Sequence, residues 1–479
     1  MSIRRGSVHD QRVGRRLLSK RVVTAAWCMF AGLVFLFSAY ALISRSMHPY
    51  PGLVDFVQEW TSARNYLSGH PIYMDLNASV ALNLGNGRAG LPEGSFNVHP
   101  PVAVMLALPF GLLGYQSGLV AWTMVSLAAL ALSLVLIVRQ PGLGYGWLSL
   151  SPIVTIVLLS NPFSQQVHHG QLNLFLLLLI TGGWVAARAG RRELGAIQIA
   201  LAAALKLFPA FLFLYFLARR EWRSLFVGGL AFVFVSIIAI AVLGVGNVLT
   251  YVADVLPTTG RFSDLWLNAS LGGYWSKLFH TPSGHVMPLL SSPTIAYGLT
   301  LASSGVVIAA VSQRVRVAES MADHDRAFAL AVIGMLLVSP ITWDHNLLLL
   351  IPSLALIWKT TPATAFNRTF LIGVIALLAI NPGVVWRALI AGDGEWARGA
   401  ARSVARPVHT LTILSYPLYT LLALFGFAFF TKTTTLSATD AESPPPLLPS
   451  ARNPDAVLKT SPVDVSASSR ATLRSRSKR

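Results

Sequence analysis

Residues 51–71 read PGLVDFVQEWTSARNYLSGHP and open the first long polar segment after an apolar run. Within this segment Asp55 and Glu59 stand four positions apart, with apolar residues around them. Because residues four apart share one face of a helix, the pattern predicts a short amphipathic helix with both carboxylates on one side. Partial removal from water raises the basicity of a carboxylate, which suits a proton acceptor at a membrane surface. A juxtamembrane helix whose acids are merely solvated is the alternative.

The composition around this segment is that of an all-α polytopic membrane protein. Hydrophobic residues make up 54% of the 479 residues and charged residues only 12%, and the mean hydropathy is +0.60. This length accommodates a bundle of roughly ten transmembrane helices of about 20 residues each. The net charge of +18 comes from basic residues in loops and at both termini, a distribution that favours anionic lipids over nucleic acid as the counter-charge. A single cysteine, Cys28, excludes an intrachain disulfide.

Hydropathy divides the chain into three parts. We expect a basic cytoplasmic N-terminus over 1–21, a transmembrane domain over 22–430 and a disordered cytoplasmic tail over 431–479, rich in Ser, Thr, Pro and charge. The first apolar run is too long for a signal peptide and predicts an uncleaved helix. The ten expected spans are 22–43, 117–138, 147–160, 171–187, 224–244, 291–311, 327–339, 345–358, 369–390 and 408–430.

Two segments do not fit simple crossings. Basic loops at 188–192 and 219–223 flank one apolar stretch, so if both are cytoplasmic the stretch cannot cross the membrane once. A re-entrant helical hairpin bent near Lys206 and Pro209 resolves this. Residues 101–113 are short and contain proline, and predict an interfacial or half-inserted helix on the outer side.

Under this topology the polar clusters meet on the outer side of the membrane. They are Asp55 and Glu59, the HPP segment at 99–101, NPFSQQVHHGQLN at 161–173, the Lys206 bend, the loop 245–290 and SPITWDHN at 339–346. Ionisable groups beside apolar spans are costly unless they face a polar cavity, so the clusters predict one shared site.

Each cluster also has a structural explanation. His168 and His169 suit interfacial anchors, and Lys206 could extend its ammonium to the headgroups. Asp344 and His345 follow Trp343, as in an aromatic belt with a local ion pair. Gln171 and Asn173 suit hydrogen bonds between helices. The chain lacks metal-ligand spacings such as HExxH, and no phosphate-binding glycine loop precedes a helix, so we expect neither a metal nor another cofactor.

Taken in order, these motifs resemble glycosyltransferase family 87 of the GT-C superfamily, the polyprenyl-phosphate-sugar-dependent mannosyl- and arabinofuranosyltransferases. The resemblance rests on DFVQEWTSARNYLSGHPIY (55–73), NVHPPVAVML (97–106), HHGQLNLFLLLLI (168–180), LKLFPAFLFLYFLARREWR (205–223) and SPITWDHNLLLL (339–350), with LNASLGGYWSKLF (267–279) as a looser match. The chain departs from the family at His99, where tyrosine is expected, and at Asn346, where a second histidine often stands.

The resemblance implies a GT-C-type bundle with outer juxtamembrane helices and an inverting transferase that moves a sugar, by our expectation mannose, from a polyprenyl phosphate. The acceptor would be an envelope glycolipid or glycan on the periplasmic side of the inner (plasma) membrane. Asp55 maps onto the catalytic aspartate of the family. We expect Lys206 and His345 to bind the donor phosphate. Candidate substrate-binding residues are Glu59, His169, Gln171, Asn173, Asn268 and Asp344. A transporter or flippase of a lipid-linked substrate is the alternative, and an inactive scaffold subunit is a third possibility.

Overall fold

The computed structural model describes residues 55–85, 94–145, 147–284, 286–386 and 405–434, with separate positions between Val22 and Leu36. All of these residues belong to one compact unit, Met1–Ala438. The described part is helical, apart from a single isolated bridge between Val286 and Ala405, so the all-α class is confirmed there. The predicted N-terminus 1–21, most of the span 22–43 and the tail beyond 434 lie outside the described residues.

The amphipathic helix predicted in 51–71 is present as α2 (Phe56–Leu67). It buries Phe56 and Trp60, which are at most 2% exposed, and packs against α4 (Pro101–Gly111). A Cβ on Gly111 would lie 2.8 Å from that of Ala63, so this glycine permits the close approach of the two helices. The third helix here is α3 (Leu76–Leu84), capped by the Asp75 carboxylate.

Four helical segments are long and apolar enough to cross a membrane. They are α5 (Tyr115–Val138), α11 (Trp222–Leu243), α15 (Pro293–Arg316) and the segment Pro407–Phe430, which contains α21 (Pro407–Leu411), η8 (Ile413–Ser415) and α22 (Tyr416–Phe430). The pair α7 (Asn161–His169) and α8 (Asn173–Arg188) qualifies as a fifth span if taken together, although it is bent by 119°. These segments make the chain a membrane protein.

The expected count of about ten spans is not confirmed. The remaining predicted spans correspond to shorter helices, or to helices interrupted by polar residues and proline. In α16, for example, Asp325 and Arg326 are buried among apolar residues. These helices are α6 (Trp147–Leu159), α16 (Met321–Val338), η4 (Asp344–Leu350), α17 (Ile351–Thr360), α18 (Ala365–Ala379) and α19 (Pro382–Trp386).

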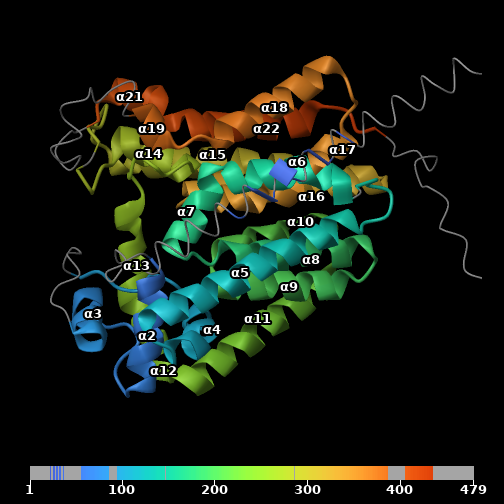
Figure 1. Ribbon diagram of the computed structural model, residues 1–479. Coiled ribbons are helices and arrows are strands. Elements are labelled where there is room, and N and C mark those ends of the chain that lie inside the picture. The colour runs from blue at the N-terminus through green and yellow to red at the C-terminus, as the bar shows by residue number, and fades with distance from the viewer. Residues whose placement is uncertain are drawn as a thin grey trace, which may run out of the picture. The chain divides into compact units, whose positions relative to one another are not determined.

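The chain folds back at Lys206, where the sequence predicted a bend. The helix α9 (Arg192–Leu205) ends there because Lys206 is extended, with φ −146° and ψ 134°. Helix resumes as η1 (Phe208–Leu212) and α10 (Phe213–Ala218). An ion pair of 3.3 Å between Arg192 and Glu221 joins the two distant ends, so the two arms form a hairpin (Figure 1). Its depth in the membrane stays a prediction.

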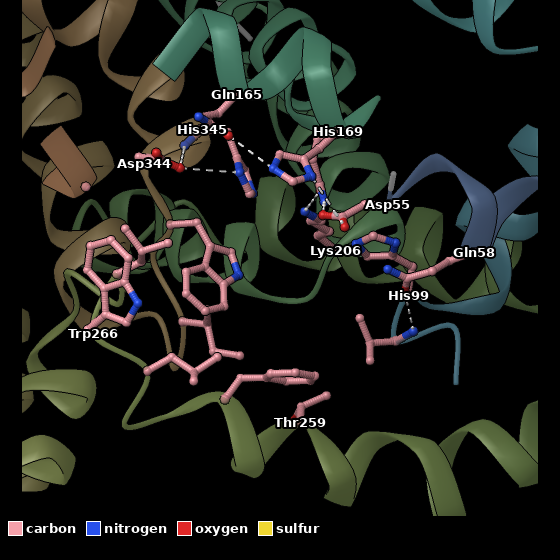
Figure 2. Close-up of a pocket in the computed structure, with 18 of the residues that line it drawn as sticks. Asp55, Gln58, His99, Gln165, His169, Lys206, Thr259, Trp266, Asp344 and His345 are labelled. Carbon is pink, nitrogen blue, oxygen red and sulfur yellow. Dashed lines mark hydrogen bonds and ion pairs between the residues drawn. The ribbon is translucent and has the colours of Figure 1, made fainter. Parts of the chain in front are cut away.

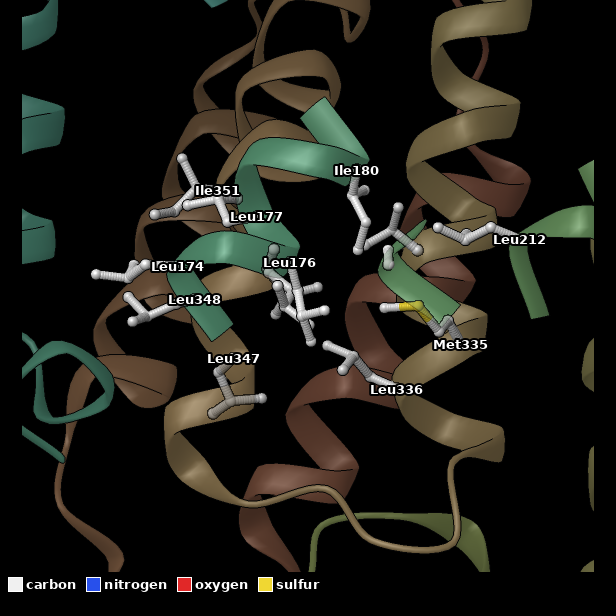
Figure 3. Packing of buried hydrophobic residues seen from close by; sticks show 14 of the residues in the cluster. Leu174, Leu176, Leu177, Ile180, Leu212, Met335, Leu336, Leu347, Leu348 and Ile351 are labelled. Carbon is white, nitrogen blue, oxygen red and sulfur yellow. The ribbon is translucent and has the colours of Figure 1, made fainter. Parts of the chain in front are cut away.

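A buried apolar core holds together the three segments that carry the predicted site residues. Figure 3 shows Leu176 and Ile180 of α8 beside Leu212 of η1, and beside Met335 and Leu336 of α16. Leu347 and Leu348 of η4 belong to the same cluster. The start of α8, the hairpin tip and the start of η4 are thereby fixed relative to one another. From α11 the chain reaches α14 (Leu271–Phe279) through α12 (Val245–Thr250), η2 (Tyr251–Val255), α13 (Leu256–Thr258) and η3 (Thr259–Phe262).

Candidate active site

A cavity of about 490 Å³ lies where α2, α7, the hairpin tip and η4 come together (Figure 2). One part of its lining is polar and the other is apolar and aromatic. Six of the nine predicted site residues line it: Asp55, His169, Gln171, Lys206, Asp344 and His345. The predicted convergence of these groups is therefore present in the structure. The other lining residues are Gln58, Val98, His99, Gln165, Thr259, Phe262, Leu265, Trp266, Leu267, Ile341, Trp343, Asn381 and Gly383.

Asp55 occupies the position just before α2, where an aspartate usually caps the first backbone N–H groups. Its side chain makes no such capping bond. Instead, Oδ2 accepts a hydrogen bond of 2.5 Å from Nε2 of Gln171, and Oδ1 lies 3.5 Å from Nδ1 of His169. The carboxylate keeps 38% of its surface exposed. It is therefore held by two side chains of the opposite wall and still open to a ligand.

The ionisation of Asp55 is decided by two opposing influences. Burial is the largest and by itself raises the pKa of the carboxyl. The hydrogen bond and positive charge of His169, the charge of His345 and the hydrogen bond from Gln171 outweigh it. Together they lower the pKa of Asp55 from 3.8 to about 2, so the carboxylate is ionised at every physiological pH.

Gly170 brings the end of α7 against the start of α2. It ends α7 in the left-handed region, with φ 64° and ψ 38°, which glycine adopts without strain. A Cβ at this position would lie 2.8 Å from the Cβ of Phe56. The turn places His169 and Gln171, on its two sides, opposite Asp55.

Lys206 reaches the cavity from the tip of the hairpin. Its Nζ donates a hydrogen bond of 3.0 Å to Oε1 of Gln171, whose Nε2 binds Asp55. The amide of Gln171 thus links a carboxylate and an ammonium group that belong to distant parts of the chain. The Lys206 ammonium is thereby held at the cavity wall.

The buried His345 completes the basic side of the cavity. Its ring centroid lies 6.2 Å from that of His169, and its Nε2 has no hydrogen-bond partner within the described part of the chain. Asp344 is oriented by Asn161, which donates a hydrogen bond of 2.6 Å to Oδ2. A buried nitrogen without a partner costs free energy, and a ligand in the cavity would remove that cost.

The other three predicted substrate-binding residues lie behind the cavity wall. Glu59 is 2% exposed and contacts Nδ1 of His99. Asn173 is fully buried and donates to Gln166. Asn268 is 1% exposed, accepts from the backbone N–H of Thr342 and donates to backbone oxygens. These three side chains shape the wall from behind, because each is buried and hydrogen-bonded within the protein.

Several lining residues were not singled out from the sequence. Gln165 precedes His169 by four positions and contacts its Nε2 at 3.1 Å, so helical spacing could have identified it. Gln58 lies one turn after Asp55, which is the same signal. Trp266 and Asn381 carried no local signal, because only the fold brings their loops together.

Taken together, the cavity combines an ionised carboxylate, a set of basic groups and an aromatic wall. Such a site can receive the proton of a hydroxyl group and bind an anion beside it. Among the residues that the structure describes, no group of three His, Cys, Asp or Glu side chains could hold a metal ion.

Comparison with known proteins adds a family and several relatives. The sequence profile of glycosyltransferase family 87 matches residues 97–340, which are 244 of the 479 residues. The polyprenol-phosphate-mannose-dependent alpha-(1-2)-phosphatidylinositol mannoside mannosyltransferase of Mycobacterium tuberculosis is 25% identical over 376 residues, 74% of this chain and 80% of that protein. Its namesake from Mycolicibacterium smegmatis is 24% identical over 410 residues, 78% of this chain and 88% of that protein.

A third relative carries a related name. The polyprenol-phosphate-mannose-dependent alpha-(1-2)-phosphatidylinositol pentamannoside mannosyltransferase of Mycolicibacterium smegmatis is 25% identical over 314 residues. The match covers 63% of this chain and 70% of that protein. All three relatives are named for the same class of lipid-linked mannose donor.

Proposed function

The chain belongs to glycosyltransferase family 87, and from this we propose that it transfers mannose from a polyprenyl phosphate to a glycolipid or glycan of the cell envelope. The reaction takes place at the outer face of the inner (plasma) membrane and inverts the anomeric carbon. The names of the relatives support the donor class and a phosphatidylinositol mannoside type of acceptor.

One observation carries the proposal. Asp55 faces the basic side chains of Lys206 and His345 within a single cavity, and the Gln171 amide links Asp55 to Lys206. A transfer from a lipid phosphate needs a base for the acceptor hydroxyl and positive charge for the departing phosphate. The cavity supplies both.

The reaction balances with the groups that the cavity contains. The acceptor oxygen attacks C1 of the donor sugar, and the bond between C1 and the phosphate oxygen breaks. The phosphate oxygen leaves with the bonding electrons as polyprenyl phosphate, and the hydroxyl proton goes to Asp55. A single displacement of this kind uses one carboxylate rather than the pair of a retaining enzyme.

The low pKa of Asp55 is consistent with a late proton transfer. A carboxylate whose pKa is about 2 is always ready to accept a proton but is a weak base. The attacking oxygen becomes strongly acidic once its bond to C1 has largely formed, so the proton moves late. Earlier in the reaction the negative charge of Asp55 favours the positive character that develops at C1.

Lys206 and His345 are assigned to the departing phosphate. Lys206 is a point charge with free rotation of its donors, and the unpartnered Nε2 of His345 offers a second contact. The apolar side of the cavity, which includes Phe262, Leu265 and Trp266, suits the first isoprene units of the donor. With no nucleotide diphosphate to bind, the reaction needs no divalent metal to hold one.

The test is a donor panel with purified protein in lipid nanodiscs. Radiolabelled polyprenyl-phosphate mannose, glucose and arabinofuranose are each incubated with a glycolipid extract, and the product linkage is determined by NMR. We expect transfer from the mannose donor, and the anomeric configuration of the product to be opposite to that of the donor. Movement of intact donor across the bilayer without sugar transfer would instead establish the transporter or flippase alternative.

A further inference from the structure

A second carboxylate of α2 acts on the cavity through a histidine. Glu59 is 2% exposed and does not line the cavity, whereas His99 does, and Nδ1 of His99 contacts Oε1 of Glu59. The two side chains are therefore arranged as a buried carboxylate behind an imidazole that reaches the ligand space. This arrangement recurs where a protein fixes one orientation and one tautomer of a histidine ring.

The backbone around His99 is held as firmly as its ring. The backbone N–H of His99 donates 3.0 Å to Oδ1 of Asn97, and Oη of Tyr73 donates 2.8 Å to the carbonyl oxygen of His99. Nδ2 of Asn97 also lies 3.4 Å from Oε2 of Glu59. These contacts hold the His99 backbone and the Glu59 carboxylate that orients the ring, so the other ring nitrogen points in one direction.

That other nitrogen, Nε2, is available to a ligand. Within the described part of the chain it makes no hydrogen bond, and the residue lines the cavity. We assign the proton of the neutral ring to Nδ1, because the Glu59 carboxylate can only accept. Nε2 then carries a lone pair and accepts a hydrogen bond from an O–H group.

The position of His99 relative to Asp55 indicates which ligand carries the O–H group that Nε2 binds. Glu59 follows Asp55 by one helical turn, about 6 Å along the axis at 1.5 Å per residue. In the view of Figure 2, Asp55 and Lys206 lie between His345 and His99. The donor phosphate belongs to the side of Lys206 and His345, so His99 faces the part of the ligand space that remains for the acceptor.

We propose that His99, oriented by Glu59, determines acceptor specificity by accepting a hydrogen bond from a second hydroxyl of the sugar whose first hydroxyl is held by Asp55. One sugar ring spans both groups. Glu59 is a positioning residue that acts only through His99. This inference rests on the proposed transferase function and adds the residue that orients the acceptor.

Three variants separate this role from a structural one. In His99→Asn the new amide occupies the place of Nδ1, which keeps a partner for Glu59 but removes the group at Nε2. We expect at least a tenfold rise in KM for the acceptor, with donor KM and thermal midpoint as in the wild type. In His99→Gln the amide reaches the place of Nε2, and acceptor KM returns part of the way. Glu59→Gln gives a smaller rise, because the ring remains but its orientation is less fixed.

The kinetic outcome is decisive in either direction. A wild-type acceptor KM in His99→Asn overturns the proposal, and so does an equal rise in the KM values of donor and acceptor. His70→Asn is the matched control, because this exposed histidine lies outside the cavity lining and its replacement should change neither constant.

A spectroscopic measurement tests His99 without relying on transfer. Protein with ¹⁵N-labelled histidine in proteoliposomes gives a His99 signal that is identified by its absence in His99→Asn. We expect the Nδ1-protonated tautomer, and a shift of the Nε2 resonance on adding methyl α-D-mannoside but not inorganic phosphate. If the wild type transfers no mannose while the mannoside still moves this resonance, the proposed function fails and the role of His99 stands. An Nε2-protonated ring, or a resonance that the mannoside leaves unchanged, overturns the role of His99.

Discussion

Asp55 and Lys206 hydrogen-bond to opposite ends of one side-chain amide, that of Gln171, at 2.5 and 3.0 Å. The carboxylate belongs to the start of α2 and the ammonium to the tip of a hairpin whose arms are α9 and α10. Gln171 orients the two charged groups without letting them form a direct ion pair. Both therefore stay available to a ligand in the cavity.

Replacing Asp55 should remove activity and leave the fold intact. In Asp55→Asn the proton acceptor is lost, and we expect transfer to fall by at least about a hundredfold, the usual contribution of a general base. The thermal midpoint should barely change, because Asp55 does not cap α2. Single-turnover transfer and thermal unfolding of the same preparation check both expectations.

Asp75 provides the matched control, since it precedes α3 and does cap it. Its carboxylate accepts from the backbone N–H groups of Asn77 and Ala78. Asp75→Ala should cost about 1 kcal/mol of stability while transfer proceeds normally. Activity retained in Asp55→Asn would refute its role as the base.

Replacing Lys206 should act on the donor. In Lys206→Met the apolar stem is retained and the charge is lost, so kcat/KM for the donor should fall by about ten- to a hundredfold, the value of one charge-assisted hydrogen bond. Acceptor KM should change little. Lys359→Met, a lysine that packs over Tyr145, is the control and should behave as the wild type. Unchanged donor kinetics in Lys206→Met would favour the alternative in which the Lys206 ammonium lies among the lipid headgroups.

The pH dependence should change when His169 is replaced. His169 is the main group that holds the pKa of Asp55 at about 2, against the effect of burial. In His169→Gln burial dominates and the pKa of Asp55 rises. As the pH falls, a base whose pKa is raised becomes protonated, and therefore inactive, at a higher pH than the same base in the wild type. The ratio of variant to wild-type activity should thus decrease as the pH is lowered from 7 to about 4.

A profile with the same acid limb in His169→Gln and the wild type would contradict this account of Asp55. His70→Gln serves as the control, because His70 is exposed and does not line the cavity.

Gly170→Ala should destabilise the protein more than the same change at another left-handed glycine. Both Gly170 and Gly69 have positive φ, but only at Gly170 would a Cβ meet a neighbour, Phe56, at 2.8 Å. We expect a cost of about 1 kcal/mol for Gly69→Ala and about 2 to 3 kcal/mol for Gly170→Ala. Denaturant unfolding in detergent measures the difference, and equal costs would show that α2 yields to the added methyl.

The side of the membrane can be tested with introduced cysteines in a Cys28→Ser background. His70 and Glu319 are both exposed, in loops after α2 and after α15. If the cavity opens to the outside, a membrane-impermeant maleimide should label His70→Cys but not Glu319→Cys in intact cells. Labelling of Glu319→Cys alone would place the cavity on the cytoplasmic side.

Local sequence patterns predicted the helices that carry the site better than they predicted the number of spans. The spacing of Asp55 and Glu59 correctly indicated a helix, and the basic loops around 195–217 correctly indicated a bend at Lys206. The count of about ten spans is not confirmed, because hydropathy measures apolar character but not where a helix stops. In the described residues only four segments, or five with the bent pair, are long enough.

The two carboxylates that were predicted to share one helical face, Asp55 and Glu59, have different surroundings in the structure. Helical periodicity places Asp55 and Glu59 on one face, and it treats them alike. In the structure Asp55 faces the cavity, whereas Glu59 is covered by His99. The amides behave similarly: Gln171 reaches the cavity and Asn173 is buried against Gln166.

The sequence by itself determined the membrane character, the helical class, the family resemblance and the set of polar residues from which the site is built. These follow from composition, periodicity and short motifs, which act over a few neighbouring residues. Only the tertiary structure decided which of those residues share a cavity, that Gln171 joins Asp55 to Lys206, and that Glu59 contacts His99. Those contacts join segments far apart in the chain, and their geometry depends on how the apolar core packs, which no local pattern specifies.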